Sequence, residues 1–338
     1  MPAEWEKQQS TLIGWPYNKN DWPGKFKNIP NVFAKIISKI TESQEVNLLI
    51  KNSTSKNTIK KLLKKNNAKI RNIKFIICKT DRVWMRDTGP IFIKDKKNKN
   101  ILLNWKFNGW AKYKNYRLDN KVSLKIKNHY KGRIISPKFN KKLIVLEGGS
   151  IDVNGKGLLL TTKECLLSKI QQRNSFLKIK DYNHIFKKFL GVKKIIWLNK
   201  GIEGDDTHGH VDDIARFVNY NKVFLAYENN KNDKNYKNLN ENFEILKRTK
   251  INFLKIKIRK IPMPKPIYIN KVRVPASYLN FYILNKSVLL PTFKDPKDKI
   301  VIKIFKKEFK NRKIIPIDCS ELIWGYGAIH CLTQQEPK

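Results

Sequence analysis

Short apolar segments alternate with amphipathic segments along this chain. Runs rich in β-branched and aromatic residues predict strands, at residues 46–50, 74–79, 90–94, 101–107, 143–146, 157–162, 194–198, 214–219, 222–227, 253–258, 281–291 and 313–317. Apolar residues that recur every three or four positions predict helices, at residues 31–42, 58–65, 182–190, 240–248 and 300–309. Groups of strand, strand, helix and strand therefore recur, which predicts an α/β architecture with functional residues on its loops.

The chain has no linker that would divide it into domains. The polar segments 229–238 and 294–299 are short enough to be surface loops. A length of 338 residues, 41% of them hydrophobic, is sufficient for a sizeable core. We therefore expect a single catalytic domain over residues 1–338.

Neither a membrane segment nor a secretion signal is visible in the sequence. No apolar run approaches the roughly 18 residues that a membrane span requires. The N-terminal segment carries Glu4, Glu6 and Lys7 where a signal peptide would be apolar. These features predict a cytoplasmic protein with no membrane partner.

The chain is strongly basic, with 71 Lys and Arg against 28 Asp and Glu and a formal net charge of +43. Such a charge raises nucleic-acid binding as one hypothesis. Lysine is spread through nearly every segment, however, and accompanies asparagine, as in residues 64–67 and 96–100. This pattern indicates a compositional bias along the whole chain. We expect no specific nucleic-acid partner and at most weak, salt-sensitive adhesion.

Four motifs differ from this lysine-rich background because scarce acidic residues, glycine, histidine and one cysteine gather in them. They are residues 84–90 (WMRDTGP), 147–150 (EGGS), 205–213 (DDTHGHVDD) and 325–335 (GYGAIHCLTQQ). Polar motifs of this kind tend to follow the expected strands. They are therefore the candidates for a functional site.

Cys331 differs from the other cysteines in its surroundings. It follows Gly-x-Gly-x-x-His and precedes Thr-Gln-Gln, whereas Cys78, Cys165 and Cys319 lie in apolar segments and are interpreted as core residues. Glycines let the backbone approach a ligand closely. One interpretation of Cys331 is a buried, inert thiol, and the other is a nucleophile, which requires a proton donor or acceptor elsewhere in the chain.

His210 is the natural partner for such a nucleophile. His210 and Asp212 point to the same side if the segment is extended. A rival hypothesis is a metal site made by His208, His210 and Asp212. The remaining histidines lie in no second ligand motif, so we expect no metal.

A thiol, a histidine and several carboxylates together favour one kind of chemistry. Carboxylates bind a guanidinium group through paired, charge-assisted hydrogen bonds. The planar cation then presents its central carbon to a nucleophile, and its charge favours the thiolate. A locally acidic site in a basic chain therefore predicts a small cationic substrate.

The motifs resemble those of the agmatine deiminases and, more broadly, of the guanidine-modifying superfamily that includes the bacterial peptidylarginine deiminases. The resemblance begins at residues 14–16 (GWP), includes the motifs at 84–90, 147–150 and 204–217, and ends at 329–337. It implies an α/β propeller (the pentein fold), with pseudo-fivefold ββαβ repeats around a central active site.

The resemblance also implies roles for individual residues. Cys331 would be the nucleophile, and His210 the general acid and later the general base. Asp87 and Asp212 would hold the guanidinium group. Glu147 would lie beside that group and His210 and help to position both.

Further residues are implied to shape the pocket. Trp84 and Trp15 would form its walls, and Asp206 would accept the distal ammonium group of the substrate. The family often has a glycine run and an asparagine where this chain has residues 326–328 (YGA). This departure concerns the shape of the pocket beside the cysteine.

The activity that the resemblance implies is hydrolysis of agmatine to N-carbamoylputrescine and ammonia, in putrescine and polyamine biosynthesis. The alternative is the same chemistry on peptidyl or free arginine. No metal and no organic cofactor are implied. The sequence leaves open whether the protein is a homo-oligomer.

Overall fold

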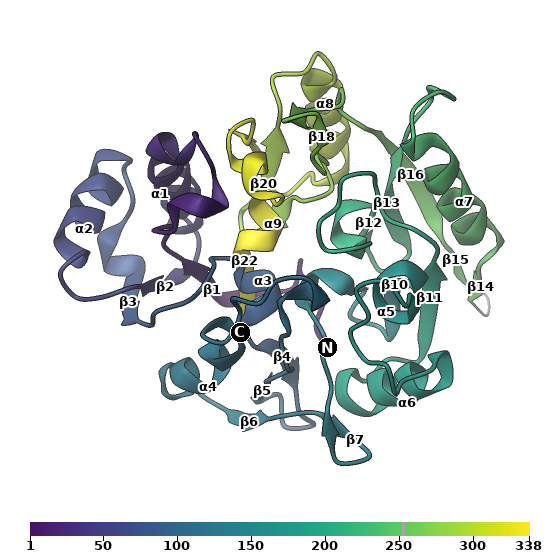
Figure 1. Ribbon diagram of the computed structural model, residues 1–338, viewed down its shortest axis with the longest axis horizontal. Coiled ribbons are helices and arrows are strands. Elements are labelled where there is room, and N and C mark those ends of the chain that lie inside the picture. Colours follow the sequence, from purple (N-terminus) through teal and green to yellow (C-terminus); the bar gives the residue numbers. More distant parts are fainter. Residues whose placement is uncertain (252–253) are drawn as a thin grey trace.

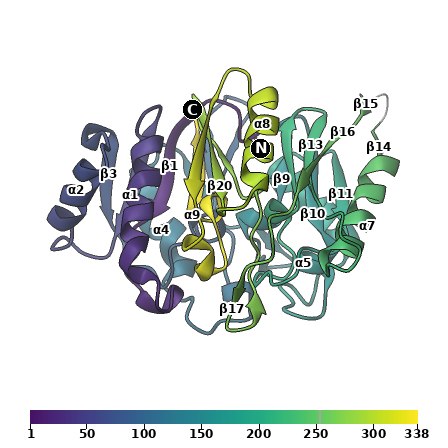
Figure 2. The ribbon, with the colours of Figure 1, turned by 90° about the horizontal axis from the view of Figure 1, so that it is seen from above.

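The computed structural model describes residues 1–251 and 254–338. Its first sheet joins the two ends of the chain. Strands β1 (Gln8–Gly14), β2 (Glu45–Ile50) and β3 (Ile73–Ile77) pair in parallel, and β22 (Thr333–Pro337) pairs antiparallel with β1. In Figure 2 the two termini accordingly lie on the same side of the molecule.

The other large sheets repeat one pattern, in which a middle strand pairs antiparallel with the strand before it and parallel with the strand after it. These sheets are β4 (Ile91–Lys94), β5 (Asn100–Leu103) and β6 (Arg133–Ile135); β9 (Asp152–Val153), β10 (Leu158–Thr162) and β11 (Lys194–Leu198); β12 (Ala215–Asn219), β13 (Lys222–Tyr227) and β16 (Lys257–Pro262); and β19 (Tyr282–Ile283), β20 (Ser287–Thr292) and β21 (Lys313–Asp318). The recurrence of strand, strand, helix and strand is the mixed α/β architecture that the sequence predicts.

A helix connects each pair of parallel strands, as the geometry of a parallel crossover requires. These helices are α1 (Ile29–Ile40), α2 (Lys56–Lys65), α4 (Val122–Ile126), α6 (Ile179–Leu190), α7 (Asn235–Arg248) and α8 (Lys297–Glu308). The short helices α3 (Met85–Thr88) and α9 (Ile329–Leu332) lie near the middle of the molecule in Figure 1, with the longer helices toward the outside.

The remaining elements are small. Helix α5 (Lys163–Leu167) follows β10 directly. Three two-stranded hairpins are β7 (Lys138–Phe139) with β8 (Lys142–Leu143), β14 (Lys250–Ile251) with β15 (Leu254–Lys255), and β17 (Tyr268–Ile269) with β18 (Val272–Arg273) in the described residues.

Local sequence explains why these segments form. On α6, the buried residues Tyr182, Ile185, Phe186 and Leu190 recur every three or four positions and make one apolar face. The helix ends at Gly191, whose φ of 69° is left-handed and favours glycine. Strand β10 is buried along its whole length, as expected for a middle strand covered on both faces.

Most of the predicted segments coincide with observed elements, and the five predicted helices are all present but begin earlier than predicted. Of the strand predicted at 143–146, only Leu143 lies in a strand, β8, and Val145 makes an isolated bridge to Lys106. The single strand predicted at 281–291 is two paired strands, β19 and β20. The strand predicted at 253–258 begins outside the described residues, and its remainder is divided between β15 and the start of β16 at Lys257.

Strands β1 and β22 were not predicted from the sequence because their composition is polar. Gln8, Ser10 and Thr11 are all buried. Their side chains find partners inside the protein: Gln44 donates to Thr11 at 2.8 Å, and Asn47 donates to Ser10 at 2.9 Å. Polar side chains that are satisfied in this way can lie in a buried strand.

Within the described residues, no helix has both the length and the apolar composition to cross a membrane.

Pairing of β1 with β22 yields a prediction about stability. Deleting residues 333–338 should lower the Tm by at least several degrees, because it strips a buried strand from β1 and exposes unpaired backbone groups. Thermal unfolding followed by circular dichroism checks this. Deleting only the exposed Lys338 is the matched control and should change the Tm little. An unchanged Tm after the longer deletion would contradict the prediction that pairing of β22 with β1 stabilises the fold.

Candidate active site

Four segments that are far apart in the sequence meet at the middle of the molecule. Asp87 lies on α3, Glu147 directly before the turn Gly148–Ser150, His210 directly before the turn Val211–Asp213, and Cys331 on α9. Helix α3 contacts α9 and the first turn, and the two turns contact each other. The structure therefore brings together the four motifs that the sequence analysis singled out.

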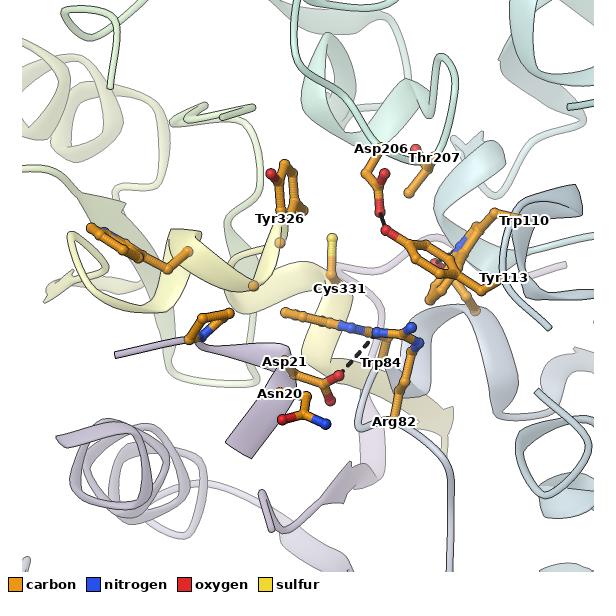
Figure 3. Close-up of a pocket in the computed structure, with 15 residues that line it drawn as sticks. Asn20, Asp21, Arg82, Trp84, Trp110, Tyr113, Asp206, Thr207, Tyr326 and Cys331 are labelled. Atoms are coloured by element: carbon orange, nitrogen blue, oxygen red, sulfur yellow. Dashed lines mark hydrogen bonds and ion pairs between the residues drawn. The ribbon is translucent and has the colours of Figure 1, made fainter. Parts of the chain in front are cut away.

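A cavity of about 180 Å³ opens beside these segments (Figure 3). Trp84, Asp87, Asp206 and Cys331 line it, as do residues from other parts of the chain: Asn20, Asp21, Pro23, Arg82, Trp110, Tyr113, Thr207, Trp324, Gly325, Tyr326 and Gly327. Glu147, His210 and Asp212 are buried next to Cys331 and Asp87. The cavity thus has aromatic walls and an acidic, thiol-bearing interior.

Cys331 is held in place by Asn280. The side-chain carbonyl of Asn280 accepts hydrogen bonds from the backbone N–H groups of His330 and Cys331, at 3.0 and 3.2 Å. Its amide donates to Cys331 Sγ at 3.1 Å and to Asp213 at 2.9 Å. Burial, followed by the charges of Asp212, Asp213 and Asp87, raises the pKa of the Cys331 thiol well above its usual value. With the cavity free of a cation, the sulfur therefore keeps its proton.

His210 lies between carboxylates. Its Nδ1 is 3.9 Å from Asp87 Oδ2 and 4.0 Å from Asp212 Oδ1, and its Nε2 is 3.9 Å from Glu147 Oε2. Burial opposes a charge on the ring, but Asp87, Cys165 and Glu147 outweigh burial and raise the pKa of His210 well above its usual value. His210 therefore carries a proton that it can give to a leaving group.

Asp87 and Asp212 differ in how they are held. Asp87 accepts from Trp110 Nε1 at 2.9 Å and from the backbone N–H of Gly149 at 3.1 Å, and its burial raises its pKa to about 6. Asp212 Oδ2 is 2.7 Å from His330 Nδ1, and this contact keeps the pKa of Asp212 low despite burial. Asp212 Oδ1 has no hydrogen-bond partner among the described residues. It is free to bind a guanidinium group.

Glu147 is fully buried and ionised. Arg173 donates from Nε to Glu147 Oε1 at 3.0 Å, and both side chains have no exposed surface. Burial would raise the pKa of Glu147, but the charge of Arg173 overcomes this and lowers it to about 2. The second oxygen, Oε2, has no hydrogen-bond partner in the described part of the chain. It faces His210.

Glycines make room for the aromatic and ionic groups. A methyl group at Gly149 would come within 2.5 Å of His210 Nδ1. A methyl group at Gly325 or Gly327 would come within 3.0 or 2.7 Å of the Trp84 ring. The glycines that the sequence analysis noted beside Cys331 are therefore required by the packing of Trp84.

The two tryptophans expected as walls lie in different places. Trp84 lines the cavity, and its ring centroid is 5.7 Å from that of Trp22. Trp15 is absent from the described residues that line the cavity. It follows β1, donates its backbone N–H to Leu49 at 2.8 Å and packs in the core. The role of Trp15 as a wall therefore stays a prediction, and the aromatic side chains that line the cavity beside Trp84 include Trp110 and Tyr113.

Asp206 lies at the cavity wall with two partners. Tyr113 donates its hydroxyl to Asp206 Oδ2 at 2.5 Å, and Lys112 forms an ion pair with Asp206 Oδ1. The Lys112 side chain is 44% exposed. An exposed lysine thus lies where the distal ammonium group of a substrate was expected.

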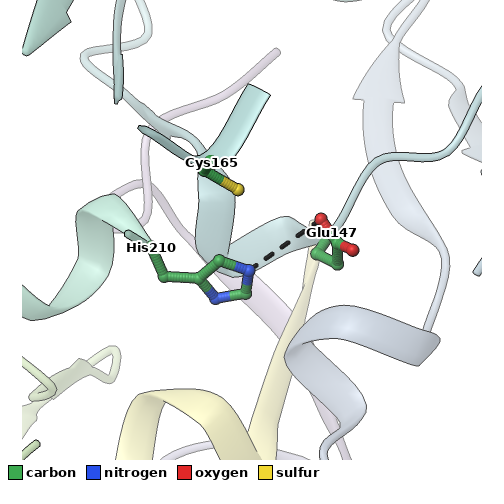
Figure 4. A group of neighbouring side chains, drawn as sticks. All are labelled: Glu147, Cys165 and His210. Carbon is green, nitrogen blue, oxygen red and sulfur yellow. Dashed lines mark ion pairs between the residues drawn. The ribbon is translucent and has the colours of Figure 1, made fainter. Parts of the chain in front are cut away.

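One group of side chains resembles a metal site (Figure 4). Glu147, Cys165 and His210 each offer a ligand atom, and these atoms lie within 4.8 Å of one another. One oxygen of Glu147 in this group, Oε1, is already bound by the guanidinium of Arg173 at 3.0 Å. His208 lies outside the group and bonds to Ser168 at 3.1 Å, so the run of residues 208–212 is not one ligand set.

Several residues of the site carry no sequence signal that could have revealed them. They are Asn280, Arg173, Trp110 and Tyr113. Each is a single polar or aromatic residue outside a motif of recognised spacing. His330 was also given no role, although its position next to Cys331 was an available indication.

The chain is similar over its whole length to proteins of known class. Residues 1–337 match the Porphyromonas-type peptidyl-arginine deiminase family. A provisionally named agmatine deiminase of Mycoplasma capricolum is 32% identical over 360 residues, which cover 100% of this chain and 95% of that protein.

Solved structures give the same result. A cysteine-to-serine variant of the agmatine deiminase of C. jejuni, with substrate bound, has a TM-score of 0.88 at 31% identity, covering 100% of this chain and 96% of that one. The agmatine deiminase of Enterococcus faecalis has a TM-score of 0.88 at 27% identity, covering 100% and 95%.

The likeness in sequence and fold places the chain among the deiminases. More particularly, it belongs to the Porphyromonas-type peptidyl-arginine deiminase family.

The raised pKa of Cys331 predicts how its thiol reacts. Iodoacetamide should alkylate Cys331 slowly at neutral pH, and the rate should rise about tenfold per pH unit until the pH passes the raised pKa, because only the thiolate reacts. Mass spectrometry of the peptide that contains Cys331 measures the rate, with a small-molecule thiol as the reference. A fast rate that is already constant between about pH 6 and 8 would contradict a neutral thiol.

Proposed function

We propose that this protein hydrolyses agmatine to N-carbamoylputrescine and ammonia through a covalent intermediate on Cys331. One observation carries the proposal: a thiol, a protonated histidine and two buried carboxylates, Asp87 and Asp212, converge at one small cavity. The relatives named agmatine deiminases, similar over the whole chain, support the choice of substrate.

In this proposal Asp87 and Asp212 bind the guanidinium group. Each carboxylate is fixed by a donor on one side, Trp110 for Asp87 and His330 for Asp212. A carboxylate that cannot rotate holds the planar cation in one orientation, which brings its central carbon toward the nucleophile. Asp212 Oδ2 lies 3.9 Å from Cys331 Sγ, so a cation bound there is beside the sulfur.

The bound cation is also what activates Cys331. Two of the three carboxylates that raise the pKa of the thiol, Asp212 and Asp87, are those that bind the guanidinium in this proposal. A positive charge placed among them offsets their effect and favours loss of the thiol proton to solvent. The thiolate then forms a bond from sulfur to the guanidinium carbon.

His210 carries the protons. Its proton passes to the departing nitrogen, ammonia leaves, and an amidino group remains on Cys331. The neutral ring then removes a proton from water, the resulting hydroxide attacks the same carbon, and the Cys331 thiolate leaves. Glu147 faces the His210 ring in both its protonated and its neutral state, since the free Glu147 Oε2 is 3.9 Å from His210 Nε2. Splitting one hydrolysis into two steps is the advantage of covalent catalysis.

The distal amine of agmatine is assigned to Asp206. In this account the amine displaces Lys112 from the Asp206 carboxylate, and Trp84 and Trp110 surround the chain of methylene groups. The cavity therefore favours a linear guanidine with a cationic end.

The same chemistry on free arginine is the second candidate. Arg82 lines the cavity and could meet a substrate carboxylate. Its guanidinium is bound to Asp21 at 2.9 Å, however, so that an arginine substrate would have to compete with Asp21.

The wider architecture that we propose is one catalytic unit over residues 1–338, an α/β propeller of five ββαβ repeats. Its support is the repeated order of an antiparallel and a parallel pair in five sheets of the described chain, with α3 and α9 between them. The C-terminal strand β22 supplies the antiparallel partner of the first sheet.

The direct test is turnover of agmatine by the purified protein. Ammonia release and mass spectrometry of the product should show N-carbamoylputrescine, with free arginine and a peptidyl-arginine substrate measured alongside. Cys331→Ala should lower kcat by at least about a thousandfold with the fold intact, whereas Cys319→Ala is the control and should leave kcat unchanged. If the protein hydrolyses arginine and not agmatine, the proposed substrate is wrong. If Cys331→Ala retains activity, the proposed mechanism through Cys331 is wrong.

Asp206 and its lysine partner give a prediction about KM. Asp206→Asn should raise the KM for agmatine about three- to tenfold with kcat nearly constant, because it removes a charge far from the reacting carbon. Lys112→Met should lower the KM by a smaller factor, since the substrate amine no longer competes with a lysine. Steady-state kinetics measure both, and Lys114→Met is the matched lysine control. If the wild-type protein and the three variants have equal KM values, the distal amine of agmatine does not bind at Asp206.

A further inference from the structure

Glu4 lies 326 residues before His330 in the sequence, yet the two side chains are in contact. Glu4 Oε2 is 2.7 Å from His330 Nε2, and Asp212 Oδ2 is 2.7 Å from His330 Nδ1. All three side chains are buried. One imidazole ring therefore bridges a carboxylate of the N-terminal segment and a carboxylate of the active site.

The bridge fixes which groups donate. A carboxylate oxygen accepts hydrogen bonds, so both ring nitrogens of His330 must donate. Hydrogen bonds of this charge-assisted kind are stronger and more directional than neutral ones. The ring of His330 thus holds Asp212 by Oδ2 and leaves Asp212 Oδ1 without a partner in the described residues.

Glu4 is itself fixed from several sides. Arg216 Nη2 lies 3.0 Å from Glu4 Oε1, the backbone N–H of Ile283 donates to the same oxygen at 2.8 Å, and Arg86 Nη2 lies 3.3 Å from Oε2. These contacts leave the Glu4 carboxylate little freedom to rotate. The fixed Glu4 carboxylate orients the His330 ring, and the ring in turn orients the Asp212 carboxylate.

We propose that Glu4 is a positioning residue for the reaction, acting through His330 to hold the Asp212 carboxylate toward the guanidinium group. This inference rests on the proposed function. Glu4 touches neither the cavity nor the substrate in this account. The most direct path from Glu4 to the chemistry runs through the His330 ring to Asp212.

A matched control comes from Asp152. Arg216 lies between Glu4 and Asp152, with its Nε donating to Asp152 Oδ2 at 2.6 Å, and Asp152 is buried like Glu4. Asp152 makes no contact with His330 in the described structure. A purely structural role of Glu4, exerted through Arg216, would make substitutions of Glu4 and Asp152 equivalent.

The experiment measures kcat/KM for agmatine in Glu4→Gln, Asp152→Asn, His330→Asn and the double variant of Glu4 and His330. Glu4→Gln should lower kcat/KM about 10- to 100-fold, the range for losing a charge-assisted hydrogen bond. Asp152→Asn should change kcat/KM less than about threefold even if it lowers the Tm. In the His330→Asn background, Glu4→Gln should add less than about a twofold loss, because the path is already broken.

Three outcomes would overturn the inference. They are unchanged kinetics in Glu4→Gln, equal losses in Glu4→Gln and Asp152→Asn, and a full extra loss from Glu4→Gln when His330 is already Asn. A wild-type protein that does not turn over agmatine would instead refute the proposed function. The two failures are therefore distinguishable.

If Glu4→Gln fails to fold, a measurement on the wild-type protein still tests the bridge. The chain has five histidines, so ¹⁵N-histidine NMR can resolve each ring, with His330 assigned by its loss in His330→Asn. N–H protons on both nitrogens of the His330 ring support the bridge. A ring with a single N–H proton contradicts it, whatever the substrate.

Discussion

Buried carboxylates around a single thiol are the constraint on which the rest of this structure depends. Asp87, Asp212 and Asp213 all act against the ionisation of Cys331. Asp87 also acts on His210, where it joins Cys165 and Glu147 in raising the pKa of the ring against the effect of burial. Such a cluster is unfavourable until a cation enters it. The energetic cost of assembling the site is therefore offset by the ligand that it is built to bind.

The fold makes this concentration of charge possible by giving each of these carboxylates a partner within the protein. Arg173 neutralises Glu147, His330 and Glu4 hold Asp212, and Trp110 holds Asp87. These partners come from different sheets and loops, so that no local segment could assemble the site alone. Closure of the first sheet by β22 places α9, and with it the nucleophile, next to α3.

The sequence was sufficient to predict the repeating α/β order and the four motifs that meet at the site, because those motifs combine scarce acidic residues with glycine and histidine. It was not sufficient for β1 and β22, whose polar side chains are buried through tertiary hydrogen bonds that no local pattern encodes. The roles of Asn280 and Glu4 could not be predicted from the sequence for the same reason. Their importance arises from contacts with residues more than 50 and 300 positions away.

Trp15 shows what a resemblance does not decide. Its motif resembles that of the family, which predicts a place in the pocket, but Trp15 is not among the described residues that line the cavity. A resemblance indicates the segments of a site, whereas packing decides which side chain of each segment reaches the cavity.

The most direct test of the account is the chemical state of Cys331 during turnover. The protein is mixed with agmatine and quenched in acid, and the peptide that contains Cys331 is weighed by mass spectrometry. The account predicts an amidino group on Cys331, present with agmatine and absent without it. Turnover with Cys331 never modified, or with the group on Cys165, would contradict it.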